Sequence, residues 1–154
     1  MLIHPVIYYL KYEDQTLSGR EKVALLSQRS REALRVSAEK SGVVFGSLKK
    51  DSNGSPLPFR DNYWSLSHKS ECVAAVVGKT LIGIDIEKIQ PRSESLFDYI
   101  ASQDEWVLIC GDKWDFFFRI WTAKEAVLKA TGVGLSGLKV CKLVGVPDEK
   151  KNGS

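Results

Sequence analysis

The order of apolar and polar residues predicts a chain that mixes strands with helices. Apolar, β-branched runs that indicate strands lie at 3–12, 73–77, 81–86 and 138–146. Positions that repeat with helical spacing lie at 18–40, at about 95–110 and at 114–131, where Gly132 ends the last helix. This combination predicts an α+β fold with an antiparallel sheet packed with helices.

Local signals predict where two of these elements begin and turn. Ser18 and Glu21 have the spacing of a capping box at the start of the first long helix. Gly78-Lys79 separates two strand-like runs and suits a tight turn. We therefore expect 73–77 and 81–86 to pair as a hairpin.

The run LIGIDIEKI at 81–89 places acidic groups on a strand-like segment. Side chains alternate along a strand, so Asp85 and Glu87 share one face with Gly83, which leaves space beside them. The opposite, core-facing positions are Ile82, Ile84 and Ile86. Strand geometry puts the carboxylates about 7 Å apart, where they repel unless a cation or a proton lies between them. A Mg²⁺ site explains this pattern, and so does a half-exposed hairpin with a solvated polar face.

The helix predicted at 114–131 carries a second set of charged groups. Lys124 falls within its apolar stripe, where an ammonium group must reach solvent or pair with an anion. Glu125 is its neighbour, and Lys129 lies one turn later. One interpretation is a surface pair of Glu125 with Lys129 at i,i+4. The other places Glu125 at a cation with the two strand carboxylates and lets a lysine reach a phosphate.

Composition narrows the function classes. The chain has 154 residues, 44% apolar and 27% charged, which fits one globular domain. A net charge of +3 does not indicate nucleic-acid binding. No apolar run approaches the roughly 20 residues that cross a membrane, and the first residues lack a signal-peptide pattern. Three scattered cysteines predict neither disulfides nor a zinc site, and reduced thiols suit the cytoplasm.

Two motifs together carry a family resemblance. GIDIEKI at 83–89, followed by WTAKEAVLK at 121–129, resembles the paired signature of the 4′-phosphopantetheinyl transferases of the surfactin-synthetase-activating type. Three weaker matches stand in the family's order: NGSPLP at 53–58, SLSHK at 65–69 and SQDEW at 102–106. The resemblance extends over about residues 18–135.

The resemblance implies a reaction and a domain plan. Such enzymes move phosphopantetheine from coenzyme A to a serine of an acyl or peptidyl carrier protein and release 3′,5′-ADP. We expect one domain at 1–146, built of two similar halves at about 1–80 and 81–146. The tail at 147–154 is expected to be disordered.

The resemblance also implies roles for single residues. Mg²⁺ on the pyrophosphate of coenzyme A would be held by Asp85, Glu87 and Glu125. Positive charge at the phosphates would come from Lys129 and Lys124. The adenosine end of the substrate would meet Ser67, His68 and Arg31. Glu105 is a candidate base for the carrier serine, beside a metal-bound water. Ordinary structural roles stay open for the histidine, the arginine and Glu105.

The chain departs from the family pattern in three respects. Ser55 stands where the family usually has lysine, which removes a phosphate contact unless Lys49 or Lys50 replaces it. Lys69 stands where a small residue is usual after the histidine. The chain is also short, so a trimmed second half and a site completed within a homo-oligomer both stay open. Two other functions stay open too: a non-catalytic module that binds coenzyme A or a carrier protein, and a Mg²⁺-dependent phosphohydrolase.

Overall fold

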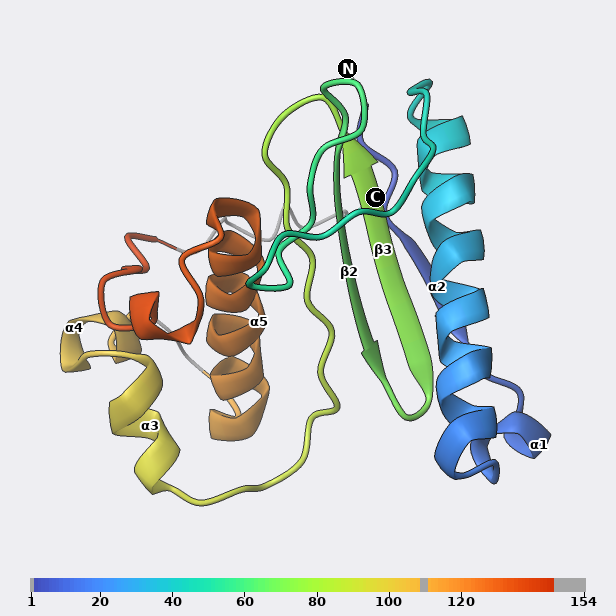
Figure 1. The fold of residues 1–154 in the computed structure, drawn as a ribbon. Helices are drawn as coiled ribbons and strands as arrows, with labels where there is room; N and C mark the ends of the chain where they lie inside the picture. The colour runs from blue at the N-terminus through green and yellow to red at the C-terminus, as the bar shows by residue number, and fades with distance from the viewer. Residues whose placement is uncertain (1, 109–110, 146–154) are drawn as a thin grey trace, which may run out of the picture.

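The computed structural model describes residues 2–108 and 111–145. Its elements along the chain are β1 (Val6–Tyr9), α1 (Tyr12–Gln15), α2 (Gly19–Lys40), β2 (Tyr63–Lys69), β3 (Cys72–Gly78), α3 (Ser95–Ile100), α4 (Gln103–Trp106), α5 (Lys113–Thr131) and the 3₁₀ turn η1 (Leu135–Gly137). The predicted α+β class with an antiparallel sheet is confirmed. Figure 1 shows the sheet between α2 on one side and α5, α3 and α4 on the other.

The sheet consists of three antiparallel strands in the order β1-β3-β2. Its central strand, β3, is buried along its whole length. Helix α2 packs its apolar stripe on this sheet, because stripe residues recur with helical spacing. The first core therefore contains Leu26, Ala33, Leu34 and Ala38 from α2 and Val73, Ala75 and Val77 from β3.

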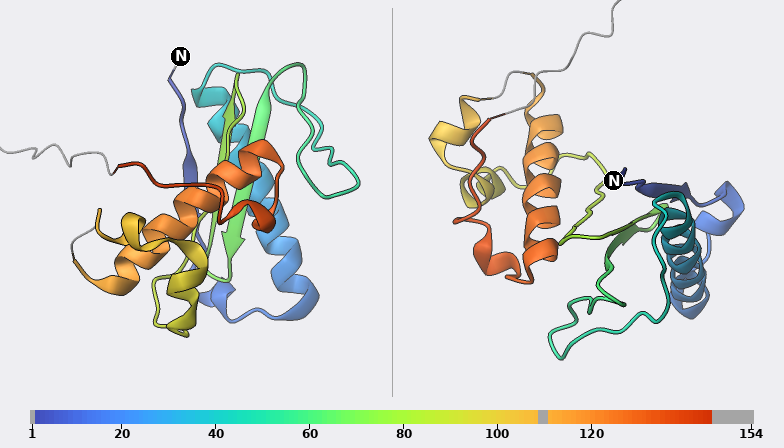
Figure 2. Two further views of the ribbon diagram at one scale, coloured as in Figure 1. Left: turned by 90° about the vertical axis from the view of Figure 1, so that its left-hand side faces the viewer. Right: turned by 90° about the horizontal axis from the view of Figure 1, so that it is seen from above.

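The hairpin forms between different segments from those predicted. β2 and β3 pair with Lys69 opposite Cys72, so the turn is Ser70-Glu71. The hairpin predicted around Gly78-Lys79 is wrong, because β1 and β2 already occupy both edges of β3. Residues 81–93, which we call the crossing segment, have no regular secondary structure and run between the sheet and α5 (Figures 1 and 2).

Side chains of β2 hold the crossing segment against the sheet. Ser65 Oγ accepts a hydrogen bond from the backbone N–H of Ile84 at 3.2 Å. Two residues further along the same face of the strand, Ser67 Oγ donates to Asp85 Oδ1 at 2.7 Å. The alternation of serines in β2 thus sets the position of the crossing segment although no strand pairing does.

Gly83 brings the crossing segment into backbone contact with α5. A Cβ atom at this position would lie 1.7 Å from the carbonyl oxygen of Ala126 and 3.0 Å from the amide nitrogen of Ala130. The expectation that Gly83 leaves space beside the carboxylates is therefore wrong. The missing side chain lets a helix approach, and this approach brings Glu125 on α5 toward the acidic residues of the segment.

A second core lies under α5 and is separate from the first. Aromatic side chains from α5 pack with the end of α3, and the buried members are Ile100, Ala101, Trp114, Phe117, Phe118 and Ile120. Asp112 caps α5 by accepting hydrogen bonds from the N–H groups of Trp114 and Asp115. Gly132 ends the helix in a left-handed conformation at φ 71°, as predicted.

Several other predicted boundaries change. The first strand shortens to β1, and Ser18 is the N-cap of α2 without a side-chain capping bond. The helix expected at about 95–110 divides into α3 and α4, and 109–110 lie outside the described residues. No strand forms at 138–145, while 146 and the predicted tail also lie outside. Among the helices of the described ranges, none is long and apolar enough to cross a membrane.

Gly83→Ala is predicted to destabilise the fold by about 1–3 kcal/mol, because the new methyl group must displace the backbone of α5. Urea unfolding followed by circular dichroism measures this change. Gly145→Ala is the matched control, since a Cβ there meets no atom within 4 Å. Equal stability of the two variants would show that the contact between the crossing segment and α5 is not as close as described.

Candidate active site

The crossing segment and α5 bring three carboxylates to one cavity. Asp85 and Glu87 come from the segment and Glu125 from the helix, and together they line a cavity of about 410 Å³. The side chain of Asp85 is only 5% exposed. Its Oδ1 atom accepts a hydrogen bond from the Ser67 hydroxyl and lies 2.6 Å from Lys129 Nζ. The Lys129 ammonium thus pairs with Asp85 of the crossing segment, and the alternative of a surface i,i+4 pair with Glu125 is wrong.

Three buried carboxylate oxygens in this cavity have no hydrogen-bond partner. They are Asp85 Oδ2, Glu87 Oε2 and Glu125 Oε1. An unpartnered buried oxygen costs free energy, so such atoms indicate a missing water or ion. Burial and the nearby carboxylate of Asp85 raise the pKa of Glu125, although Lys129 opposes the shift. A bound cation would offset the repulsion between the carboxylates and would interact with the oxygens that lack hydrogen-bond partners.

The carboxylates suit Mg²⁺ by their chemistry rather than as a closed cage. Within the described residues, no three His, Cys, Asp or Glu side chains form a ready-made metal cluster. Mg²⁺ often binds through only one or two carboxylates and completes its shell with waters and substrate phosphate. Asp85 and Glu125, each with a buried free oxygen, fit that mode.

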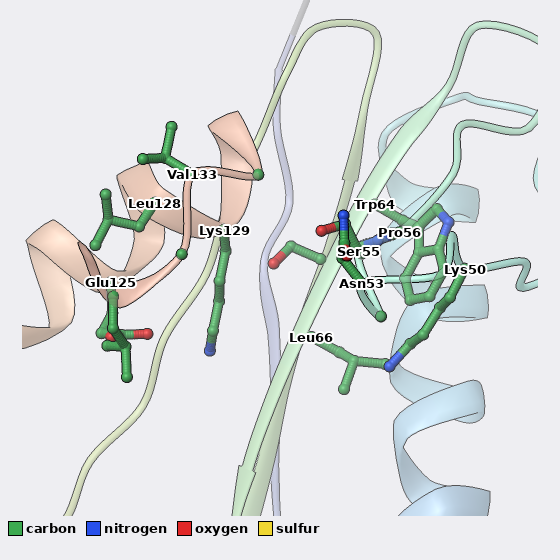
Figure 3. A pocket seen from close by; sticks show the side chains of 15 residues that line it. Lys50, Asn53, Ser55, Pro56, Trp64, Leu66, Glu125, Leu128, Lys129 and Val133 are labelled. Atoms are coloured by element: carbon green, nitrogen blue, oxygen red, sulfur yellow. The ribbon is translucent and has the colours of Figure 1, made fainter. Parts of the chain in front are cut away.

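Two further cavities share lining residues with this one. One of about 490 Å³ has Glu125 and Lys129 on one wall and Ser55 on the opposite wall, as Figure 3 shows. Another of about 290 Å³ reaches Arg31 on α2. Leu66 of β2 lines all three cavities, so they adjoin at this strand, and we call them together the depression.

The depression is bordered by cationic side chains near His68. The pKa of His68 lies below its usual value because of desolvation and the ammonium groups of Lys69, Lys129 and Lys50. His68 is therefore neutral at pH 7 in the free protein. Lysines on three different segments create a positive environment that would favour a phosphorylated ligand.

Comparison with known proteins gives this geometry a family. Residues 81–153 match the model of the 4′-phosphopantetheinyl transferase superfamily. The 4′-phosphopantetheinyl transferase HetI of Nostoc sp. is 36% identical over 123 residues, which cover 70% of this chain and 52% of the relative. This chain belongs to the 4′-phosphopantetheinyl transferase superfamily.

Two Bacillus relatives cover shorter stretches. The 4′-phosphopantetheinyl transferase psf-1 of Bacillus pumilus is 32% identical over 95 residues, or 58% of this chain and 41% of the relative. The 4′-phosphopantetheinyl transferase Sfp of Bacillus subtilis is 35% identical over 80 residues, or 49% of this chain and 36% of the relative. The chain thus spans about half the length, or less, of these members of the superfamily.

The structure brings most predicted site residues together. Around the 410 Å³ cavity stand the three carboxylates with Ser67, His68 and Lys129. Arg31 lies in the adjoining 290 Å³ cavity, where His68 also contributes. The sequence reasoning missed Leu66, Trp121 and Leu135 as lining residues. Leu66 and Trp121 lie within the SLSHK and WTAKEAVLK motifs, but no signal in the sequence indicated that they line a cavity.

Glu105 and Lys124 lie apart from that cavity and pair with each other. Their charged atoms are 2.7 Å apart, and each side chain is only 4% exposed. Lys124 also donates to the carbonyl oxygens of Ile100 at 2.6 Å and Leu138 at 3.4 Å. Lys124 in the apolar stripe therefore pairs with an anion, as predicted, and the anion is Glu105.

Glu105 has hydrogen bonds on both carboxylate oxygens. Its Oε2 atom accepts from the N–H and hydroxyl of Ser102, and Oε1 accepts from the N–H of Leu143. Burial alone would raise the pKa of Glu105, but the Lys124 ammonium and these donors lower it to about 2. The carboxylate therefore stays ionised and joins α4, α5 and the chain after η1.

The Glu105 pair predicts a specific loss of stability in acid. The pKa is lower in the folded state than the 4.5 of a free glutamate, so the stabilisation is fully present above pH 4.5. It falls as pH drops toward 2, by roughly 3 kcal/mol in total. Urea unfolding between pH 7 and 3 should show this fall in the native protein and a much weaker one in Glu105→Gln.

Two further variants separate the pair from general effects of acid. Exposed Glu39→Gln should keep the native pH dependence, because it removes only a surface i,i+4 pair. Glu105→Gln alone leaves Lys124 buried without its anion, so the double variant with Lys124→Met should be more stable than Glu105→Gln. The same acid dependence in native protein and Glu105→Gln would contradict the assignment.

Proposed function

We propose that this chain transfers the 4′-phosphopantetheine group of coenzyme A to a serine of an acyl or peptidyl carrier protein and releases 3′,5′-ADP. The observation that carries the proposal is the set of three buried carboxylate oxygens without hydrogen-bond partners, which lie in a cavity that Lys129 also lines. The relatives' names agree with this reaction.

Asp85 and Glu125 are the proposed ligands of Mg²⁺, with Glu87 as the third carboxylate of the set. Each of the three contributes a buried oxygen that lacks a hydrogen-bond partner. Mg²⁺ at this position would neutralise charge on the diphosphate of coenzyme A and on its leaving group. Ser67 contributes by holding Asp85 through its hydroxyl hydrogen bond.

Lys129 is proposed to bind the diphosphate of coenzyme A. Its ammonium pairs with Asp85 at 2.6 Å in the free protein, and its side chain remains 31% exposed, so it can turn toward the 490 Å³ cavity that it lines. A phosphate oxygen would then replace the carboxylate as its partner. Through this exchange, the Lys129 ammonium pairs with the substrate phosphate when the substrate binds.

The adenosine end is proposed to lie along β2 toward α2. His68 joins the two cavities there, and Arg31 supplies a cation at the far end. Lys50 lines the 490 Å³ and the 290 Å³ cavities, so it is the stronger candidate to replace the lysine that is missing at Ser55. A phosphate near His68 would raise its pKa and favour the imidazolium form.

Glu105 and Lys124 fit a positioning role better than contact with the substrate. Glu105 accepts hydrogen bonds from three groups, and a carboxylate with a pKa of about 2 is a weak base. Lys124 is the residue before Glu125, so its buried pair fixes the turn of α5 that carries this ligand. The predicted roles of Glu105 as a base and of Lys124 as a phosphate ligand stay predictions, and the positions of the two residues do not favour them.

The two separate cores support the proposal of two halves within one domain. The first core lies within the expected half at 1–80, and the second lies within 81–146. The proposed site uses both, because β2 and α5 face each other across it. We propose that the halves act as one phosphopantetheinyl transferase-like unit and that the reaction takes place in the cytoplasm.

The test is transfer to an apo carrier protein, followed by intact-protein mass spectrometry with Mg²⁺ and coenzyme A. We expect the carrier to gain the mass of phosphopantetheine. Asp85→Asn should reduce the rate at least about a hundredfold, since it removes a negatively charged ligand of the proposed Mg²⁺ ion. Exposed Glu13→Gln is the control and should keep the native rate.

Other outcomes of this assay would contradict the proposal or indicate a different function. No mass gain on several apo carriers that a known phosphopantetheinyl transferase modifies would sink the proposal. Calorimetric binding of coenzyme A without turnover would instead identify a binding module, which Ser55 in place of the family's lysine favours. Breakdown of coenzyme A without a carrier would identify a phosphohydrolase.

A further inference from the structure

Glu87 differs from the other two carboxylates in its partners. Its Oε1 atom lies 2.6 Å from Lys69 Nζ, and its Oε2 atom lies 3.7 Å from the guanidinium of Arg92. The Glu87 side chain is only 9% exposed, so both cations meet a largely desolvated charge. Glu125, in contrast, has no ion pair with another residue of the described chain.

The position of Lys69 follows from the geometry of β2. Residues 65, 67 and 69 share one face of the strand, because side chains alternate. Ser67 contacts Asp85, and two residues later Lys69 contacts Glu87. The ion pair therefore continues the row of contacts that holds the crossing segment, and the backbone on both sides keeps it in place.

We propose that Lys69 keeps Glu87 out of the metal site, so that the cation binds Asp85 and Glu125 only. This inference rests on the proposed function, since it concerns the same cation. It agrees with the lack of a three-residue metal cluster in the part of the chain that the structure describes. Lys69 occupies a position where the family pattern has a small residue, so the feature belongs to this chain.

The charges of the cavity lead to a consequence for the order of binding. Lys69 and Arg92 neutralise the charge of Glu87. Lys129 offsets part of the charge of Asp85 until the lysine turns to bind a phosphate. Two remaining carboxylates match a divalent cation in charge but bind it weakly without phosphate oxygens. The metal should therefore bind much more tightly together with coenzyme A than alone.

The experiment measures Mn²⁺ binding by electron paramagnetic resonance, with and without coenzyme A. Lys69→Ser should tighten binding of Mn²⁺ alone about five- to tenfold, because it releases Glu87 and removes a positive charge. Glu87→Gln alone should change the affinity less than about threefold. The matched control is Lys88→Ser, which breaks a 2.6 Å ion pair with Glu71 outside the cavity.

A double variant tests whether the gain in Lys69→Ser requires the Glu87 carboxylate. If Glu87 becomes a ligand in Lys69→Ser, adding Glu87→Gln should cancel the gain. A gain that persists in the double variant, or no gain in Lys69→Ser, would overturn the inference. So would a Glu87→Gln effect as large as that of Asp85→Asn. Lys69→Gln provides a second variant if Lys69→Ser fails to fold by circular dichroism.

The failure of the inference can be distinguished from the failure of the proposed site. Loss of Mn²⁺ binding in Asp85→Asn with no effect of Lys69→Ser would reject only the role of Lys69. Native Mn²⁺ affinity in Asp85→Asn would reject the metal site itself, and the inference with it. Tight Mn²⁺ binding by native protein, unchanged by coenzyme A, would contradict the two-carboxylate arrangement.

Discussion

The contact between Gly83 and α5 determines what the rest of the cavity can do. Without a side chain at Gly83, the crossing segment lies against the carbonyl of Ala126. Asp85 follows two residues after Gly83, and Glu125 immediately precedes Ala126. A single backbone contact thus brings two carboxylates from distant parts of the chain to one cavity. Ser67 then holds Asp85 from the sheet side.

Close carboxylates are unfavourable unless positive charge joins them, and lysines supply it to two of the three. Lys129 reaches Asp85, Lys69 reaches Glu87, and Glu125 receives no ion pair among the described residues. Burial therefore raises the pKa of Glu125. The buried pair of Glu105 with Lys124 lies elsewhere, and there each charge has its partner. The paired charges of Glu105 and Lys124 stabilise the fold, while the unpaired carboxylate of Glu125 is suited to bind a ligand.

The two long helices, α2 and α5, followed from local signals, and the pairing of the strands did not. The periodicity and Gly132 placed α5 correctly, and the buried lysine in its stripe required an anion. The strand pairing depends on contacts between distant residues, which propensity does not contain. The run at 81–89 has strand-like alternation, yet β3 had no free edge to receive it. Its carboxylates could be recognised from spacing, but their ion pairs with lysines of β2 and α5 required the fold.

We propose that Asp85 and Glu125 form the cation site of a coenzyme A cavity. Crystals grown with Mn²⁺ and coenzyme A would test this arrangement through the anomalous scattering of manganese. We expect an anomalous peak in contact with Asp85 Oδ2, Glu125 Oε1 and a phosphate oxygen of the ligand. Density for bound coenzyme A with no peak there, or with the ion away from both carboxylates, would contradict it.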